Sequence, residues 1–527
     1  MKKQSFLIGA LILAVGGLVA KIVGALYKIP LTNILGTNGM GLYYLVFPFY
    51  SLLLVLISSG VSLAVTRLVC LQRINHNKKN ELIILKTAII YVFVLSIIFG
   101  VILVLLAERL AILQGNINAK VGYFAIAPSI AFASTISVLR GYFQGLENMV
   151  PTLINNILEQ VIKLISGLIL ANIFLKQGVT FAVFGAILGV TISEFVALIL
   201  IIINYLVYKK KFIYKTELPK NQKITYTQAL KLIVSYAYPA TLTAIIMPIT
   251  SFLDSFLIVN ILTGAGFSSL QATNLYGISN GIVNTLINLP VLICSSIATA
   301  IVPSLSGLYA KNNGEEVGFK TSLFIKVTWL IAIPCFLLFL IYSPDIITIL
   351  YSNGLSDLVI DEFTFSYKLL MLSSVSIIYY AFLQTFTSIL QSFNKPAVPF
   401  FSLLVALVVR IICIFTLVSN YKINIFGVTI ANLIFLSVAC VINLFYIKKF
   451  VNVKFNLLKM LVIPVFSAVV SGVVMCVVKL SLLNTNVWVY TSVSALIGIV
   501  TYFVFIFMFK SFNKKELRCF KRKRILN

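Results

Sequence analysis

Long hydrophobic runs, separated by short polar stretches, fill almost the whole chain. Each run is close to the length that an α-helix needs to cross the hydrocarbon core of a bilayer, roughly 20 apolar residues. The pattern therefore predicts an all-α polytopic membrane protein with about 14 transmembrane helices. We expect them at residues 6–34, 41–66, 82–106, 121–140, 151–175, 180–208, 228–262, 275–307, 318–341, 363–391, 397–419, 424–447, 456–479 and 487–510.

Short sequence patterns recur in the two halves of the chain, in the same order. The matching pairs are Phe184-Gly185 with Phe426-Gly427, Leu42-Tyr43 with Leu275-Tyr276, and the segment 144–151 with the segment 391–399. Their spacing of about 240 residues corresponds to six helices. This repeat predicts two six-helix lobes arranged as parallel repeats, plus two C-terminal helices, which is typical of secondary transporters.

The repeat also predicts a division of the chain into five parts. We expect an N-lobe with helices one to six at 1–208, a basic cytoplasmic linker at 209–227, a C-lobe with helices seven to twelve at 228–450, helices thirteen and fourteen at 451–512, and a basic cytoplasmic tail at 513–527.

Composition excludes a soluble globular protein. Of 527 residues, 60% are hydrophobic and only 10% are charged, with a mean hydropathy of +1.06, whereas soluble domains carry roughly 25% charged residues. The net charge is +27. Most of the basic residues fall on one side of the membrane when both termini are cytoplasmic, as the positive-inside rule requires. We therefore expect a multi-pass membrane protein with cytoplasmic termini, with membrane lipids and no nucleic acid as partner.

Cysteine and histidine give no sign of a metal site. The 7 cysteines are scattered without a CxxC pair, and the single histidine, His76, stands in a basic loop. A disulfide framework, a thiolate metal site and a two-histidine metal centre are all disfavoured by this pattern. We expect no cofactor and no metal.

We single out seven ionisable residues that lie within the expected spans. An ionisable side chain at the bilayer centre costs roughly 2.5–3.5 kcal/mol on insertion scales, so it faces a cavity or a partner. Cations outnumber acids in this set, and Lys and Arg bind phosphate through charge-assisted hydrogen bonds. We therefore expect the cations to hold an anionic headgroup, and the acids to serve as coupling groups or charge partners. The cations are Lys21, Lys28, Lys163 and Arg410, and the acids are Glu159, Glu194 and Asp254.

Structural roles for the same residues remain open alternatives. Glu159 and Lys163 stand four residues apart, a spacing that allows a salt bridge within one helix. Lys21 has no acid in its own span, so its structural alternative is a salt bridge to Glu194 or Asp254. Lys28 lies near the outer surface and can reach the headgroup region along its aliphatic stem.

Several of these segments carry a family resemblance. The stretches concerned are Lys3-Gln4-Ser5-Phe6-Leu7, Lys21-Ile22-Val23-Gly24, Gly41-Leu42-Tyr43, Leu139–Gly145 with Asn148 and Pro151, and Glu159–Lys163. With them the whole chain resembles the multidrug/oligosaccharidyl-lipid/polysaccharide flippase superfamily, in its polysaccharide transporter branch. The nearest resemblance is to the group of stage V sporulation protein B and YtgP, which is related to the lipid II flippases.

The resemblance implies two six-helix lobes around a central cavity, with a lipid-tail groove formed by the last two helices. It implies alternating access that moves an undecaprenyl-(pyro)phosphate-linked saccharide, such as a peptidoglycan precursor, from the inner to the outer leaflet. Lys21 matches the basic residue that the family keeps in its first helix. The chain departs from the Gram-negative flippase in helix two, where Leu52–Val55 replaces adjacent arginines. Cell-envelope synthesis proteins are candidate partners.

Two other functions are weighed against this one. A cation-coupled multidrug exporter of the same superfamily needs cavity-facing acids, whereas the first span offers lysines. An integral-membrane glycosyltransferase or polymerase needs acid/base or metal-binding carboxylates in an outer loop. The acids of one outer segment lack such spacing and are expected to be surface charge; they are Asp345, Asp357, Asp361 and Glu362. We expect no enzyme activity. The driving force stays open between the membrane potential and ion antiport through Glu194 or Asp254.

Overall fold

The protein is described here from a computed structural model. The structure describes residues 6–75, 77–210, 224–309, 314–355, 360–451, 458–513 and 516, without the side chains of 6–15, 297, 299–300 and 303. His76 and Asp357 lie outside the described residues, as do most of the expected linker at 209–227 and of the expected tail at 513–527. The expectations for these segments stay predictions.

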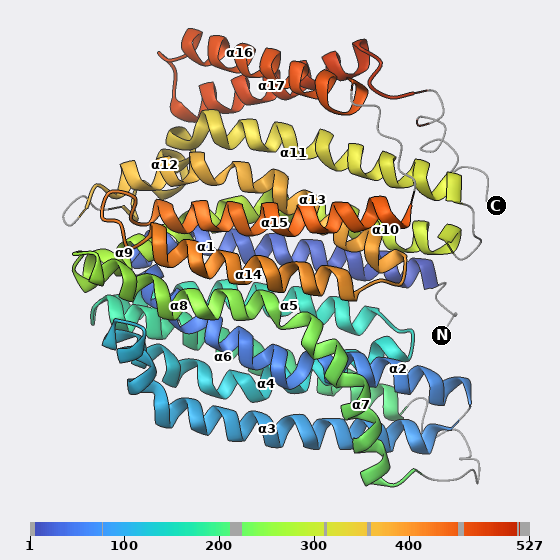
Figure 1. The fold of residues 1–527 in the computed structure, drawn as a ribbon. Coiled ribbons are helices and arrows are strands. Elements are labelled where there is room, and N and C mark those ends of the chain that lie inside the picture. The colour runs from blue at the N-terminus through green and yellow to red at the C-terminus, as the bar shows by residue number, and fades with distance from the viewer. Residues whose placement is uncertain are drawn as a thin grey trace. The chain divides into compact units, whose positions relative to one another are not determined.

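The described residues form helices and connecting turns, with no strand among them, which confirms the all-α fold (Figure 1). Contacts divide the chain into two units. Unit 1 comprises Met1–Ile282 with Asn353–Ile360, and unit 2 comprises Val283–Ser352 with Asp361–Asn527. The α-helices of unit 1 are α1 (Phe6–Leu54), α2 (Gly60–Ile74), α3 (Lys78–Leu113), α4 (Lys120–Gly145), α5 (Val150–Leu175), α6 (Val179–Tyr208), α7 (Tyr226–Ala244), α8 (Ile246–Gly264) and α9 (Ser269–Gly277).

Unit 2 contains the remaining helices, and these are also long and apolar. They are α10 (Asn284–Tyr309), α11 (Gly314–Tyr351), α12 (Glu362–Ser373), α13 (Val375–Ser392), α14 (Ala397–Leu417), α15 (Phe426–Phe450), α16 (Ile463–Ser481) and α17 (Val487–Met508). In this unit α13 packs against α10, α11 and α15, and the pair α16–α17 packs on α11.

Twelve helical segments of the described chain are long and apolar enough to cross a membrane, or up to 13 if the bent pair α12–α13 is one span. The first segment, Gly16–Ile74, has 59 residues and is therefore about 90 Å long at 1.5 Å per residue. That length suits two crossings. Its first helix breaks at Gly36, whose φ of 67° lies in the left-handed region. The first two expected spans thus meet at this glycine.

Close helix packing in unit 1 depends on small residues. α5 packs along α6, α4 packs on α3 and α6, and α1 packs on α5. A Cβ on Gly189 of α6 would lie 2.4 Å from the Cα of Gly167 on α5, so the two backbones nearly touch. Ser166 also donates a hydrogen bond to the Gly189 carbonyl at 3.0 Å. In a membrane the hydrophobic effect does not drive helices together, because lipid tails are as apolar as the side chains. Close packing of small residues and hydrogen bonds between helices drive their association instead.

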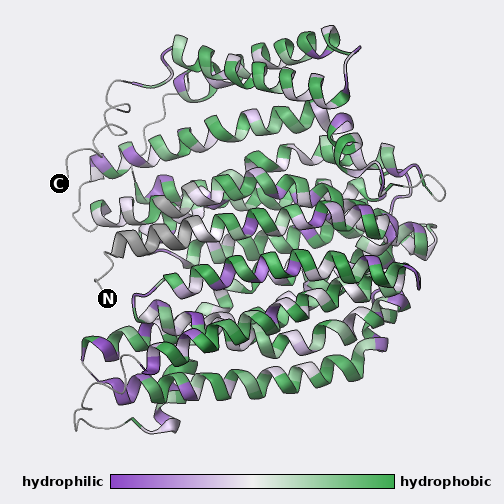
Figure 2. Cartoon of the chain, turned by 180° about the vertical axis from the view of Figure 1, so that it is seen from behind, coloured by the Kyte–Doolittle hydropathy of each residue, from purple (hydrophilic) through white to green (hydrophobic). Residues whose placement is uncertain are grey.

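The outward faces of the helices are apolar. On α3, Leu105 is 75% exposed and Val101 is 53% exposed. Figure 2 shows hydrophobic positions running along the helices and hydrophilic positions gathered at helix ends and connections. Exposed apolar surface on this scale marks contact with membrane or partner rather than with water. The chain is a multi-pass membrane protein.

Candidate functional site

Four of the expected site residues belong to one set of packed helices in unit 1. They lie on α1, α5 and α6, together with an arginine of α4 and three tyrosines of α1. We call this set the N-terminal polar cluster; its members are Tyr27, Lys28, Tyr44, Tyr50, Arg140, Glu159, Lys163 and Glu194.

Lys163 is held by aromatic rings rather than by an acid. Its ammonium nitrogen lies 5.7 Å from the ring centre of Tyr27 and 5.3 Å from that of Phe47, both on α1. Cations within about 6 Å of a ring face are attracted by its quadrupole. Among the described residues Lys163 has no ion pair within 4.0 Å. A half-buried ammonium with apolar walls is well suited to an anionic ligand.

Glu159 pairs with Arg140 of the neighbouring helix. Arg140 Nη2 lies 2.6 Å from Glu159 Oε2, and Gln160 donates to Glu159 Oε1 at 3.0 Å. The salt bridge within α5, left open as the structural role of Glu159 and Lys163, is therefore not the arrangement formed. The guanidinium also donates to Asn155 at 2.7 and 3.0 Å, and a planar guanidinium can make both contacts at once.

Glu194 is a buried acid on α6. It is 6% exposed, and its Oε1 accepts a hydrogen bond from the Tyr50 hydroxyl. Its other carboxyl oxygen, Oε2, is buried without a hydrogen-bond partner among the described residues. Lys163, Arg140 and Glu159 are near enough to interact with Glu194 electrostatically. Glu194 therefore lies inside the cluster, as a group with unused hydrogen-bonding capacity.

The two lysines of α1 differ. Lys28 donates to the Tyr44 hydroxyl at 2.6 Å, and its nitrogen is 5.1 Å from the centre of that ring. It is thus held within the cluster rather than extended toward the surface. Lys21 is exposed and makes no ion pair or hydrogen bond with the described residues, so neither Glu194 nor Asp254 is its partner.

Two expected residues lie elsewhere. Asp254 is a half-buried residue of α8 in unit 1. Arg410 is on α14 of unit 2, where it is 3% exposed and faces the packed interior of that unit. The structure thus brings together Lys28, Glu159, Lys163 and Glu194. Arg410 belongs to unit 2.

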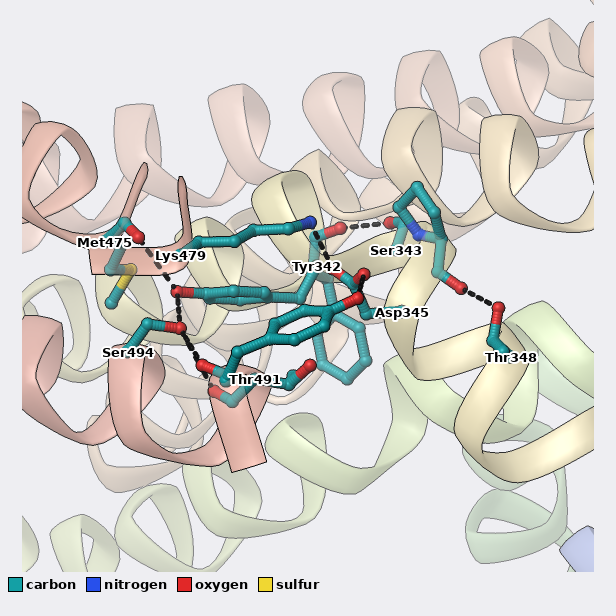
Figure 3. Close-up of polar contacts among 11 residues, drawn as sticks. Tyr342, Ser343, Asp345, Thr348, Met475, Lys479, Thr491 and Ser494 are labelled. Atoms are coloured by element: carbon teal, nitrogen blue, oxygen red, sulfur yellow. Dashed lines mark hydrogen bonds and ion pairs between the residues drawn. The ribbon is translucent and has the colours of Figure 1, made fainter. Parts of the chain in front are cut away.

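A second charged cluster, in unit 2, was wrongly interpreted from the sequence. Asp345, expected to be surface charge, is 7% exposed and forms an ion pair with Lys479. Tyr490 donates to Asp345 Oδ1 at 2.8 Å, and Tyr342 donates to Ser494 at 2.7 Å. We call these five residues the C-terminal network. Figure 3 shows Lys479 reaching from α16 across the Tyr342 ring to Asp345 on α11.

The reason for the wrong interpretation is the length of α11. The apolar run ends at residue 341, and a proline follows at 344, which usually ends a helix. In the structure α11 continues through Pro344 to Tyr351. Asp345 is thereby inside a helix and packed against α16 and α17. Glu362, also expected to be surface charge, is 2% exposed, and Asp361 caps α12 by accepting from the Thr364 N–H at 2.9 Å.

Another ion pair ties α11 to the segment that follows α17. Lys326, 4% exposed, donates to Glu516 at 2.9 Å and to the Ser511 carbonyl at 2.5 Å. The sequence offered one signal for it, since Lys326 stands inside the expected ninth span. Likewise Arg140 is the last residue of the expected fourth span. Among the described residues, no group of three or more His, Cys, Asp or Glu side chains is placed to hold a metal ion.

Known proteins resemble the chain over most of its length. The family described as polysaccharide biosynthesis protein matches residues 6–309, and the MatE family matches residues 239–416. Stage V sporulation protein B of Bacillus subtilis (strain 168) is 27% identical over 436 residues, which cover 82% of this chain and 81% of that protein. The lipid II flippase MurJ of the same organism is 23% identical over 419 residues, covering 77% and 76%.

Solved structures show the same fold. A lipid II flippase MurJ in an inward closed conformation matches with a TM-score of 0.72 at 16% identity, covering 95% of this chain and 99% of that one. An inward-facing multidrug resistance transporter of the MATE family matches with a TM-score of 0.64 at 15% identity, covering 81% and 94%. The chain belongs to the polysaccharide biosynthesis protein family, and it is a membrane transporter of the multidrug/oligosaccharidyl-lipid/polysaccharide flippase superfamily.

Proposed function

We propose that the protein is a flippase for a polyprenyl lipid that carries a saccharide on a phosphate or pyrophosphate. An undecaprenyl-linked peptidoglycan precursor or a related polysaccharide unit is the substrate class, and it moves from the inner to the outer leaflet by alternating access. The relatives named for a function include a lipid II flippase. The protein itself performs no covalent chemistry in this scheme.

The proposal rests on the surroundings of the Lys163 ammonium. Its ammonium is enclosed by Tyr27 and Phe47, and the acid one helical turn away is already occupied by Arg140. A cation kept inside a membrane protein without its own carboxylate favours a ligand that brings negative charge. Lys28 adds a second cation within electrostatic range. Lys21 and Arg410 are proposed as further contacts of the headgroup.

The cellular setting is part of the same proposal. We propose that both termini lie on the cytoplasmic side of a bacterial plasma membrane, because the basic segments of the sequence then follow the positive-inside rule. The lobes of alternating access are the segments 1–208 and 228–450, and the helices at 451–512 contact the lipid tail. Cell-envelope synthesis proteins are the proposed protein partners.

Transport in reconstituted vesicles tests the proposal. Purified protein is placed in proteoliposomes, and movement of a polyprenyl-linked saccharide to the opposite leaflet is measured. We expect Lys21→Ala to abolish transport while leaving insertion and folding intact, because the exposed ammonium is free to contact the headgroup. Lys120→Ala is the matched control, since Lys120 pairs with Glu108 at the surface. Full transport by Lys21→Ala would show that transport does not need a contact between Lys21 and the headgroup.

A cation-coupled multidrug exporter is the second candidate. The MatE match over residues 239–416 favours it. Mass spectrometry of lipid retained by gently purified protein separates the two functions. A bound polyprenyl-linked saccharide supports the flippase. Absence of such lipid, together with pH- or sodium-driven efflux of a cationic dye from proteoliposomes, supports the exporter.

A further inference from the structure

The proposed transport leaves Glu194, a buried acid of the N-terminal polar cluster, without a role. Its carboxyl is 6% exposed and has one hydrogen-bond donor, Tyr50, on Oε1. Oε2 is buried without a hydrogen-bond partner among the described residues. A buried carboxylate normally has two or three donors or a direct ion pair, because leaving an ionised oxygen unpaired is costly. The geometry around Glu194 therefore supplies too little to hold the ionised form alone.

Among the described residues, the groups that interact with this carboxyl come from helices packed on α6. α6 packs against α1, α4 and α5. The groups interacting with Glu194 are Tyr43 and Tyr50 from α1, Arg140 from α4, and Glu159 and Lys163 from α5.

The net charge of these groups depends on whether Glu194 is ionised or protonated. Arg140 and Glu159 neutralise one another at 2.6 Å, so Lys163 is the remaining cation beside Glu194. If Glu194 is ionised, it compensates Lys163 and weakens the attraction for an anion. If Glu194 is protonated, the charge of Lys163 is uncompensated, and Lys28 adds to it. One proton thus decides how positive the cluster is, because its three cations and two acids give a net charge of +1 when Glu194 is ionised and +2 when it is protonated.

We infer that Glu194 is a proton-binding site that controls the affinity of the N-terminal polar cluster for the phosphate or pyrophosphate of the substrate. The inference rests on the proposed function and assigns it a regulatory group. Anion binding at Lys163 and Lys28 takes up one proton from solution onto the Glu194 carboxyl. By linkage, each event strengthens the other by the same factor. Release of the anion returns the proton.

Proton uptake on ligand binding tests the inference directly. The full chain is purified in detergent and titrated with undecaprenyl diphosphate in buffers of different ionisation enthalpy, which gives the number of protons bound per ligand. The diphosphate also titrates, so the informative quantity is the difference between variants. We expect the wild-type protein to take up about one more proton than Glu194→Gln where Glu194 is ionised in the free protein, because the amide cannot titrate.

Affinity measured against pH gives the second readout. One linked proton corresponds to at most a tenfold change in Kd per pH unit. We expect Glu194→Gln to bind the diphosphate with the low-pH affinity of wild type and to lose this component of the pH dependence. The matched control is Glu108→Gln, an exposed carboxyl paired with Lys120, which should behave as wild type. Tyr50→Phe keeps the acid but removes its donor, so its pH dependence should persist with a displaced midpoint.

The possible failures are distinguishable. If wild-type protein binds no undecaprenyl diphosphate at any pH, the proposed function fails. If it binds and Glu194→Gln takes up as many protons as wild type, the proton site is overturned while the proposed function stands. If Glu194→Gln does not fold, Tyr50→Phe decides: a pH curve identical to wild type also overturns the proton site.

Discussion

The buried charges of the C-terminal network have more ion-pair and hydrogen-bond partners than those of the N-terminal polar cluster. In the C-terminal network, Asp345 has both oxygens occupied, by Lys479 and by Tyr490. In the N-terminal polar cluster, Lys163 lies against two rings and has no ion pair within 4.0 Å among the described residues, and within that same part of the chain Glu194 Oε2 has no hydrogen-bond partner. A buried charge with full partners rigidifies its surroundings, whereas a partly satisfied one carries a cost that function must justify.

The buried charges of unit 2 hold helices together, whereas those of the N-terminal polar cluster are suited to binding a ligand. The C-terminal network and the Lys326–Glu516 pair contact different parts of α11, and both link it to the C-terminal helices or the segment after them. Between them lies an apolar cluster that includes Leu330, Leu337 and Tyr502. These contacts join α11, α16 and α17 into one packed group. The N-terminal polar cluster instead keeps charge available for a ligand.

The largest expected effect is on stability, from breaking the C-terminal network. Asp345→Asn leaves the Lys479 ammonium without its counter-charge, and removing one partner of a buried pair costs about 3 kcal/mol or more. The loss is measured as the shift of the unfolding midpoint in a denaturing-detergent titration. Transport per folded molecule should be unchanged. The charge-swapped double variant Asp345→Lys/Lys479→Asp should recover part of the loss, and additive losses instead would contradict a direct pair.

The next effect is on binding, from removing the cation of the N-terminal cluster. Lys163→Gln should weaken binding of undecaprenyl diphosphate by about 2 kcal/mol, some thirtyfold, because a charged hydrogen bond to the phosphate is lost. Its folding should be nearly unaffected. Lys163→Arg keeps the charge and should bind better than Lys163→Gln. The control is Lys176→Ala, an exposed lysine directly after α5. Equal affinities for Lys163→Gln and Lys163→Arg would exclude a charge role.

The smallest effect is expected at the Lys326–Glu516 pair. Glu516→Gln leaves Lys326 its hydrogen bond to the Ser511 carbonyl, so the cost should be about 1 kcal/mol rather than that of a fully unpaired charge. The same detergent titration measures it. A loss as large as that of Asp345→Asn would show that the Ser511 carbonyl does not compensate.

Much of the fold was predictable because apolar length is a local property. The spans at 82–106, 121–140 and 151–175 match α3, α4 and α5, and the turn after the first span meets the break at Gly36. The cations Lys28 and Lys163 were identifiable because charge is rare inside such runs. Which charged residues pair with one another was not predictable from the sequence. Glu159 stands one turn from Lys163, yet the guanidinium of Arg140, 19 residues away, binds it.

The sequence by itself determined that this chain crosses a membrane many times and carries cations within its spans, since hydrophobic length and charge position are read along one dimension. Only the tertiary structure decided which charges are satisfied. Asp345 is buried because α11 continues through Pro344 and packs on α16. Lys163 forms no close ion pair with the described residues, because α4 brings Arg140 to Glu159. Pairing depends on which helices pack together, and local spacing does not contain that information.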